Sequence, residues 1–259
     1  MPYIHETVIA GKTIEISKYY SHRYKCKNAI RGKSIENTKE AQERINYKRQ
    51  EKKLTRLINT NFKENDYHVV LNYKKEDRPV TIEDMKNDMK QFLKRLRREC
   101  KKNEIELKYI YVAERGKKGA LHYHMVINKI DPCILTSIWE KGRVNIHLLD
   151  KTGQYKELAS YLLKFTKEHK QEAKKLSGKA WSSSRNLKKP IIIKKIINKH
   201  DFFKEKVLIP KKYRNEYYVQ KDSIYNGFHY ETGYKFFTYT LIKSNEWNKL
   251  INRKGEDYV

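Results

Sequence analysis

The stretch Leu121–Asn128 constrains the fold more than any other, because polar and bulky apolar residues alternate along it. Successive side chains of a strand point to opposite faces, so His122 and His124 would project from one face and the apolar residues from the other. A short connection containing two glycines separates this stretch from the strand-like run Lys108–Glu114. That connection predicts a hairpin, in which Glu114 at the end of the first strand lies beside His122.

Two imidazoles and a carboxylate that converge in this way form a candidate site for a divalent metal ion. Imidazole nitrogens suit Mn²⁺, Co²⁺ or Zn²⁺, and the carboxylate of Glu114 keeps Mg²⁺ possible. The alternative is that His122 and His124 are ordinary sheet residues that face solvent or form hydrogen bonds. The pattern favours a metal site but names no reaction.

A helix expected from about Thr152 to His169 carries a candidate nucleophile. Tyr161 and Lys164 share one side of it, because residues three apart are neighbours on a helix surface. A tyrosine with its usual pKa of about 10 is a poor nucleophile without help from a cation or a metal, and Lys164 could supply part of that help. The alternative is that Tyr161 is an ordinary member of the 20 tyrosines in the chain. Tyr155, on the same helix, is the fallback nucleophile.

The expected order of elements from residue 67 to residue 169 is β-α-β-β-α-β-α. The strands are expected at residues 67–73, 108–114, 121–128 and 143–149, and the helices at residues 37–60, 81–102, 132–141 and 152–169. Thr81 and Asp84 form a capping-box-like pair at the start of the helix expected at residues 81–102. This order predicts an α+β fold in which helices pack on one face of an antiparallel sheet.

Three regions are expected along the chain. Residues 1–36 show no clear period and are expected to be irregular, whereas residues 37–190 contain the motifs described above. Residues 191–259 are dense in tyrosine and phenylalanine with Asn-Gly and Thr-Gly turn signals. We expect them to form a β-rich C-terminal extension.

The charge balance indicates the kind of partner. Lys and Arg number 58 against 31 Asp and Glu, a formal net charge of +27, and such an excess favours a polyanion, most often nucleic acid. No window approaches the roughly 18 apolar residues of a membrane span, and no secretory signal is visible at the N-terminus. The three cysteines, an odd number far apart in the sequence, fit a reducing compartment. We therefore expect a cytoplasmic protein that does not act at a membrane.

Candidate DNA contacts are basic residues, which could hold the phosphate backbone, and a tryptophan, which could stack on an unpaired base. They are Arg95, Arg97, Arg98, Lys117, Lys118, Trp181, Arg185, Lys188 and Lys189. Each basic residue taken singly could equally be a solvated charge.

In combination and order, these motifs resemble those of the HUH endonucleases. More narrowly, the chain resembles the single-tyrosine rolling-circle replication initiators, or Rep proteins, of bacterial plasmids, phages and small single-stranded DNA viruses. The matched segments are Tyr67–Tyr73, Glu114 with His122-Tyr123-His124, Tyr161-Leu162-Leu163-Lys164, and Trp181–Leu187. The resemblance covers residues 37–190.

The resemblance implies a ferredoxin-like catalytic fold and a nicking and joining reaction. Glu114, His122 and His124 would hold Mg²⁺ or Mn²⁺, and Tyr161, assisted by Lys164, would attack the scissile phosphate of single-stranded or extruded origin DNA. The products would be a 5′-phosphotyrosine and a free 3′-OH. A host DNA polymerase would extend that end, and a host or element-encoded helicase would separate the strands, since the sequence has no Gly-x-x-x-x-Gly-Lys-[Ser/Thr] loop.

Two other functions stay open. A transposase or a relaxase could use the same chemistry, although a relaxase usually places its tyrosine before the histidine motif. A basic nucleic-acid-binding protein without catalytic activity would also fit the composition.

Overall fold

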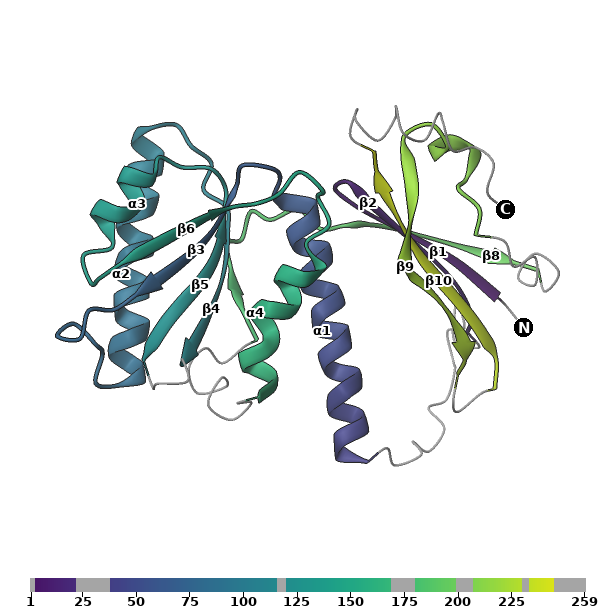
Figure 1. The fold of residues 1–259 in the computed structure, drawn as a ribbon, viewed down its shortest axis with the longest axis horizontal. Coiled ribbons are helices and arrows are strands. Elements are labelled where there is room, and N and C mark those ends of the chain that lie inside the picture. Colours follow the sequence, from purple (N-terminus) through teal and green to yellow (C-terminus); the bar gives the residue numbers. More distant parts are fainter. Residues whose placement is uncertain are drawn as a thin grey trace. The chain divides into compact units, whose positions relative to one another are not determined.

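A computed structural model describes the chain over six ranges (Figure 1). They are residues 3–21, 38–115, 120–168, 180–198, 207–229 and 233–244. The chain divides into two compact units. The central unit comprises residues 45–151 and 155–188, and the terminal unit comprises residues 1–44, 152–154 and 189–259.

The central unit is built on a five-stranded antiparallel sheet with the strand order β6-β3-β5-β4-β7. Its strands are β3 (Tyr67–Asn72), β4 (Tyr109–Arg115), β5 (Leu121–Ile127), β6 (Val144–Leu148) and β7 (Ser182–Ser183). Its helices are α1 (Lys39–Asn61, of which residues from Ile45 onward belong to this unit), α2 (Ile82–Lys102), α3 (Pro132–Ile138) and α4 (Lys156–Glu168). The order β3-α2-β4-β5-α3-β6-α4 confirms the predicted order of elements.

Helices cover both faces of this sheet, so the prediction that they pack on one face is wrong (Figure 1). Odd-numbered residues of β5, such as Tyr123 and Met125, pack with α2 and α3. Even-numbered Val126, together with Ile110 and Val112 of β4, packs with α1 and α4. The strands are thus apolar on both sides over part of their length, and each apolar side needs a helical cover.

The start of α2 confirms the predicted capping box. The Asp84 backbone N–H donates to Thr81 Oγ1 at 3.1 Å, and the Thr81 N–H donates to Asp84 Oδ2 at 3.0 Å. The carboxylate also lies in the first turn, where it interacts favourably with the helix dipole. This cap fixes where α2 begins.

The terminal unit contains a second antiparallel sheet, with the order β8-β1-β2-β10-β9. Its strands are β1 (Tyr3–Ala10), β2 (Thr13–Tyr20), β8 (Ile191–Ile197), β9 (Tyr217–Phe228) and β10 (Lys235–Lys243). A single 3₁₀ turn, η1 (Lys211–Tyr213), precedes β9. The β-rich character predicted for the C-terminal extension is confirmed.

The irregular structure predicted for residues 1–36 is wrong for residues 3–20, which form the β1–β2 hairpin. Gly11 in its two-residue turn has a φ of 58°, a left-handed conformation that favours glycine. Ile14 and Ile16, which are buried, alternate with Glu15 along β2, so a short run with the period of a strand was present in the sequence. Residues 22–36 lie outside the described ranges.

Candidate active site

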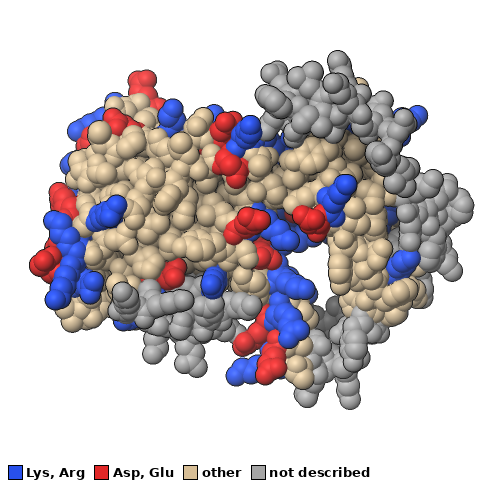
Figure 2. Space-filling view, viewed as in Figure 1, with Lys and Arg blue, Asp and Glu red and all other residues tan. Residues whose placement is uncertain are grey.

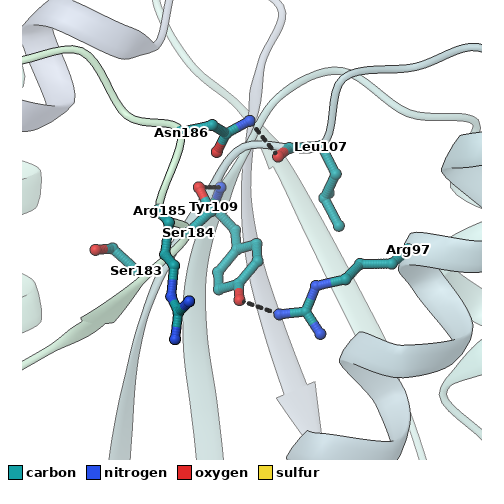
Figure 3. A pocket seen from close by; sticks show the side chains of 7 residues that line it. All are labelled: Arg97, Leu107, Tyr109, Ser183, Ser184, Arg185 and Asn186. Carbon is teal, nitrogen blue, oxygen red and sulfur yellow. Dashed lines mark hydrogen bonds between the residues drawn. The ribbon is translucent and has the colours of Figure 1, made fainter.

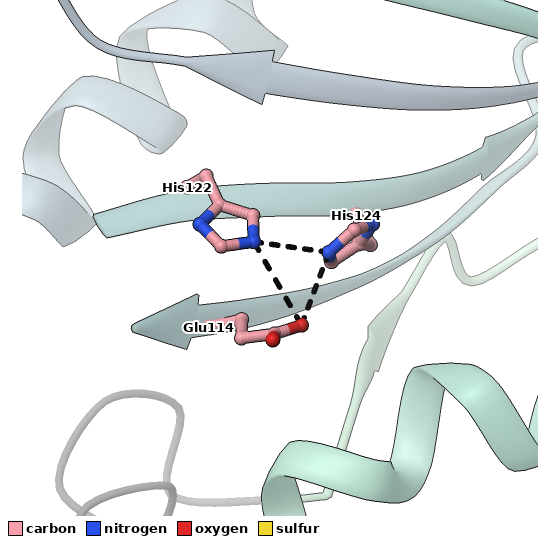
Figure 4. A group of neighbouring side chains, drawn as sticks. All are labelled: Glu114, His122 and His124. Atoms are coloured by element: carbon pink, nitrogen blue, oxygen red, sulfur yellow. Dashed lines mark hydrogen bonds and ion pairs between the residues drawn. The ribbon is translucent and has the colours of Figure 1, made fainter. Parts of the chain in front are cut away.

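Glu114, His122 and His124 lie together on one face of the central sheet (Figure 4). The β4–β5 hairpin pairs Glu114 directly with His122, as the sequence predicts. His124 follows two residues later on β5, so it points to the same face as His122. This is the face that α1 and α4 cover further along the strands.

The three side chains bring three potential ligand atoms together. Glu114 Oε2 lies 3.0 Å from His124 Nε2 and 3.8 Å from His122 Nε2. The two imidazole Nε2 atoms lie 3.1 Å apart, and all ligand atoms of the cluster fall within 4.8 Å of one another. Two neutral nitrogens and one carboxylate oxygen fit a divalent cation that keeps other positions free for substrate oxygens. The residues therefore could hold a metal ion.

The electrostatics of the cluster suit ligand binding. Burial raises the pKa of the Glu114 carboxyl, but the hydrogen bond from His124, with the charges of His124, His122 and Lys164, lowers this pKa below its ordinary value. Burial, followed by the charge of His124, lowers the pKa of His122. An ionised carboxylate and a neutral imidazole are the forms that bind metal ions.

His68 of β3 contacts this cluster, although it was not among the candidate site residues of the sequence. Its Nε2 lies 3.3 Å from His124 Nδ1, and the two rings stack with centroids 5.4 Å apart. Burial, followed by the charges of His124 and His147, lowers the pKa of His68 to about 4, so His68 is neutral near pH 7. The two tautomers of His124 serve different partners: a proton on Nε2 donates to Glu114, whereas a proton on Nδ1 would donate to His68 and leave the Nε2 lone pair for a metal ion.

A signal for His68 exists in the sequence. Tyr67, Val69 and Leu71 alternate with His68 along β3, so His68 faces away from these apolar residues. The pairing of β3 with β5 then places it on the histidine face, opposite Val126. That pairing, which no local sequence pattern specifies, connects His68 with His124.

Tyr161 on α4 lies over the histidines. Its ring centroid is 5.1 Å from that of His124 and 6.0 Å from that of His68, edge-on to both rings. The side chain is 49% exposed, so a substrate can reach it. Burial and the negative charge of Glu114 raise the pKa of Tyr161. A cation at the cluster is therefore needed before Tyr161 can act as a good nucleophile.

The rest of α4 holds Tyr161 in this position. Leu162 and Leu163 are buried with Ala159 in the core between α4, α1 and the sheet. Lys164 is exposed, one turn from Tyr161, and its charge acts on Glu114. The apolar side of α4 thus anchors the helix, while Tyr161 and Lys164 stay accessible next to the ligand cluster.

Tyr155, the fallback nucleophile of the sequence analysis, is in a structural position. Its side chain is 3% exposed, and its hydroxyl donates to the Asp150 carbonyl oxygen at 2.9 Å. Burial raises the pKa of its phenol further. The expectation that it could replace Tyr161 is therefore wrong, because its oxygen is neither accessible nor free.

The candidate DNA contacts on α2 have different environments. Arg95 pairs with Glu140 at 2.6 Å, and Arg98 lies 3.6 Å from the carboxylate of Glu99. Arg97 instead donates to the hydroxyl of Tyr109 at 2.6 Å. In Figure 2, the described residues of the visible face show basic and acidic side chains interspersed.

The later candidates lie after α4. Trp181 packs against the core of the α4 face, with the Lys53 ammonium 5.9 Å from its ring centroid. The Lys188 backbone N–H donates to Asn61 Oδ1, while the side chains of Arg185, Lys188 and Lys189 are exposed. Lys117 and Lys118 lie outside the described residues.

Comparison with known proteins agrees with the replication-associated part of the resemblance. Residues 66–170 match the family model of the replication-associated protein ORF2/G2P. The matched segment contains Glu114, His122, His124 and Tyr161 and spans less than half of the chain. It supports a Rep-type protein with a function in DNA replication. No curated protein and no solved structure matches the chain.

None of the described helices combines the length and the apolar character needed to cross a membrane.

Proposed function

We propose that the chain is a rolling-circle replication initiator that nicks single-stranded or extruded origin DNA and later rejoins the strands. One observation carries this proposal. Tyr161 lies edge-on to His124 at 5.1 Å, next to a cluster of three potential metal ligands. A tyrosine beside such a cluster suits a transfer reaction at a phosphodiester, and the family match to residues 66–170 favours DNA as its substrate.

The proposed reaction forms one ester bond and breaks another. The Tyr161 hydroxyl oxygen attacks the scissile phosphorus and loses its proton, while the 3′-oxygen of the preceding nucleotide leaves with its bonding electrons and takes up a proton. The products are a 5′-phosphotyrosine and a free 3′-OH. Rejoining is the reverse attack by a 3′-OH on the phosphotyrosine. The phosphotyrosine ester thus stores the energy of the cleaved phosphodiester bond until the strands are rejoined.

The other residues would prepare this attack. A Mg²⁺ or Mn²⁺ ion held by Glu114, His122 and His124 would polarise a phosphate oxygen and offset the negative charge that raises the pKa of Tyr161. The Lys164 ammonium would neutralise charge that develops on the phosphoryl oxygens. His68 is assigned a positioning role, because its Nε2 lies 3.3 Å from His124 Nδ1, where it would accept the proton of that nitrogen and orient the ring toward a metal ion.

The partners follow from this chemistry. The substrate would be single-stranded origin DNA, the free 3′-OH would serve a host DNA polymerase, and a host or element-encoded helicase would separate the strands. The protein would carry out these steps in the cytoplasm, where such partners are found.

A covalent-adduct assay tests the proposal. The full chain is incubated with Mn²⁺ and labelled single-stranded oligonucleotides that tile the DNA around its gene, and adducts are resolved on denaturing gels. We expect an adduct that requires the metal and disappears in Tyr161→Phe. The Tyr155→Phe variant is the matched control and should form the adduct, since Tyr155 is buried.

Two outcomes would contradict the proposal. An adduct that persists in Tyr161→Phe would assign the nucleophile to another residue. Tight, salt-sensitive DNA binding without an adduct on any oligonucleotide would indicate a binding protein without nicking activity.

A further inference from the structure

A pocket of about 510 Å³ lies at the β7 edge of the central sheet (Figure 3). Its lining comes from α2, from β4 and the residue stretch before it, and from β7 and the stretch that follows it. The lining residues are Arg97, Leu107, Tyr109, Ser183, Ser184, Arg185 and Asn186.

The pocket and the metal-ligand cluster lie on opposite faces of the same sheet. The side chain of Tyr109 belongs to the core under α2, whereas Glu114, five residues later on β4, points to the face under α4. β7 pairs with β4 only at Ile110 and Tyr111. Within the described residues, β4 beyond Tyr111 is therefore the edge of the sheet, and Glu114 lies on this open edge.

Two arginines give the pocket a positive charge that no lining residue offsets. Arg97 Nη2 donates to the Tyr109 hydroxyl, and its guanidinium lies 5.8 Å from the centroid of the same ring. Arg185 is exposed, and Figure 3 shows its guanidinium beside Tyr109. Among the described residues, no carboxylate pairs with Arg97 or Arg185, in contrast to Arg95, which pairs with Glu140.

Hydrogen bonds to the sheet fix the segment that carries Arg185. The Ser184 N–H donates to the Tyr109 carbonyl oxygen at 2.9 Å, and Ser184 Oγ accepts from the Tyr109 N–H at 3.2 Å. Asn186 Nδ2 donates to the Leu107 carbonyl oxygen and to Glu106 Oε1. Glu106 Oε2 in turn pairs with Lys108, so this carboxylate is engaged by a cation outside the pocket. The backbone on both sides of Arg185 is thus held in place before any ligand arrives.

We propose that this pocket binds a phosphodiester group of the single-stranded DNA that the protein acts on, at a site distinct from the one where the strand is cut. The guanidinium groups of Arg97 and Arg185 present paired N–H donors that match phosphate oxygens. This inference rests on the proposed function for its choice of ligand, and on the geometry of the pocket for its location.

A DNA strand suits this location better than a free phosphate compound. The pocket opens at the side of the sheet, and its two arginines are exposed. Glu114 lies five positions after Tyr109 on β4, a distance of about 17 Å along an extended strand. A flexible polyanion can turn around the open edge of β4 and contact both sites at once, whereas a small phosphate would contact only one.

A binding titration tests the proposal without any cleavage. The affinity of the full chain for a labelled single-stranded oligonucleotide is measured by fluorescence anisotropy in EDTA at several NaCl concentrations. For Arg185→Ala we expect about tenfold weaker binding, because a hydrogen-bonded contact to a charged group is lost. The slope of log K against log[salt] should also become shallower by about 0.7, the value for one phosphate contact on a single strand.

Matched variants separate the pocket from the overall charge. Arg78 is an exposed arginine of the central unit outside the pocket, and Arg78→Ala should change neither affinity nor slope beyond error. Arg185→Lys keeps the charge but loses the paired donors, so it should retain most of the salt slope and only part of the affinity. Thermal unfolding of each variant verifies that the fold is intact.

Two results would overturn the proposal. The first is an Arg185→Ala variant that binds DNA like Arg78→Ala. The second is inorganic phosphate that binds the wild-type chain in an Arg185-dependent way while DNA binding stays unchanged, which would assign the pocket to a small phosphate compound. Because the titration contains no metal and forms no adduct, failure of the nicking assay with Tyr161 leaves its result valid, and the reverse also holds.

Discussion

The two faces of the central sheet differ in how far their apolar cover extends. On the face under α2 and α3, the strand residues are buried and apolar from one end of β5 to the other, from Leu121 to Ile127. On the face under α1 and α4, the apolar residues end at Val112 of β4 and Val126 of β5, and the polar residues Glu114, His124 and His122 lie beyond them. The first face supplies stability along the whole sheet, so the second can place polar groups where its apolar cover ends.

The largest expected effect is on metal binding by the polar residues of the face under α1 and α4. His122→Ala removes one of three potential ligands, and we expect Mn²⁺ affinity to fall by more than about 100-fold, since even the loss of an outer partner of a ligand costs 10–100-fold. Isothermal titration of Mn²⁺ into the full chain measures this. Because His122 lies at the end of the apolar cover, the midpoint of thermal unfolding without metal should change little. Unaltered Mn²⁺ affinity would remove His122 from the site.

The converse prediction concerns a core substitution on the face under α2 and α3. Met125 is fully buried among residues that pack with α2 and α3. Met125→Ala should lower the free energy of unfolding by about 2–5 kcal/mol, because it leaves a cavity in a packed core. Urea unfolding measures the loss, and below the transition the Mn²⁺ affinity should match that of the wild type. A large drop in affinity in the folded variant would mean that the two faces are coupled.

A smaller effect is expected at His68, which contacts the ligand cluster without belonging to it. His68→Ala should weaken Mn²⁺ binding by about tenfold, because His124 loses the partner that orients it. His147→Ala is the matched control, since His147 is exposed and stacks on His68 rather than on His124. Equal losses in the two variants would contradict a specific role for His68.

The smallest effect is expected at the cap of α2, because neither Thr81 nor Asp84 belongs to the pocket or to the ligand cluster. The hydrogen bonds from Thr81 lower the pKa of Asp84, so the ionised carboxylate stabilises the folded state above its ordinary pKa. That stabilisation is lost as the pH falls through the lowered pKa. Asp84→Asn should therefore flatten the decline in stability at acidic pH, as measured by urea unfolding at several pH values, and leave Mn²⁺ binding unchanged.

The local part of the site was predictable from the sequence. Glu114 and His122 are joined by a hairpin, so strand alternation and a short glycine-containing turn suffice to bring them together. Tyr161 was recognised by its spacing from Lys164 and by the resemblance to Rep proteins. Its distance from His124 needed the structure, because it depends on how α4 packs on the sheet.

The long-range part was not predictable in the same way. His68 reaches His124 only because β3 pairs with β5, and no local pattern specifies which strand lies next to which. The same reason explains the wrong prediction for residues 1–36. Their strands are completed by β8 and β10, whose residues lie far away in the sequence. Alternation shows which face of a strand is apolar, but the tertiary structure determines which elements pack against that face.

The order of strands in the terminal sheet has a consequence for biosynthesis. β1 and β2 leave the ribosome before the other described strands, yet β1 pairs with β8, and β2 pairs with β10. The outer edge of β1 must therefore stay unpaired until β8 has been translated, and the outer edge of β2 until β10, the last of the described strands, has been translated. Unpaired edges are sites of aggregation, and an isolated hairpin is marginally stable. During that interval a nascent chain of this protein depends on chaperones, or on rapid completion of translation, to keep its first strands from pairing with the wrong partner.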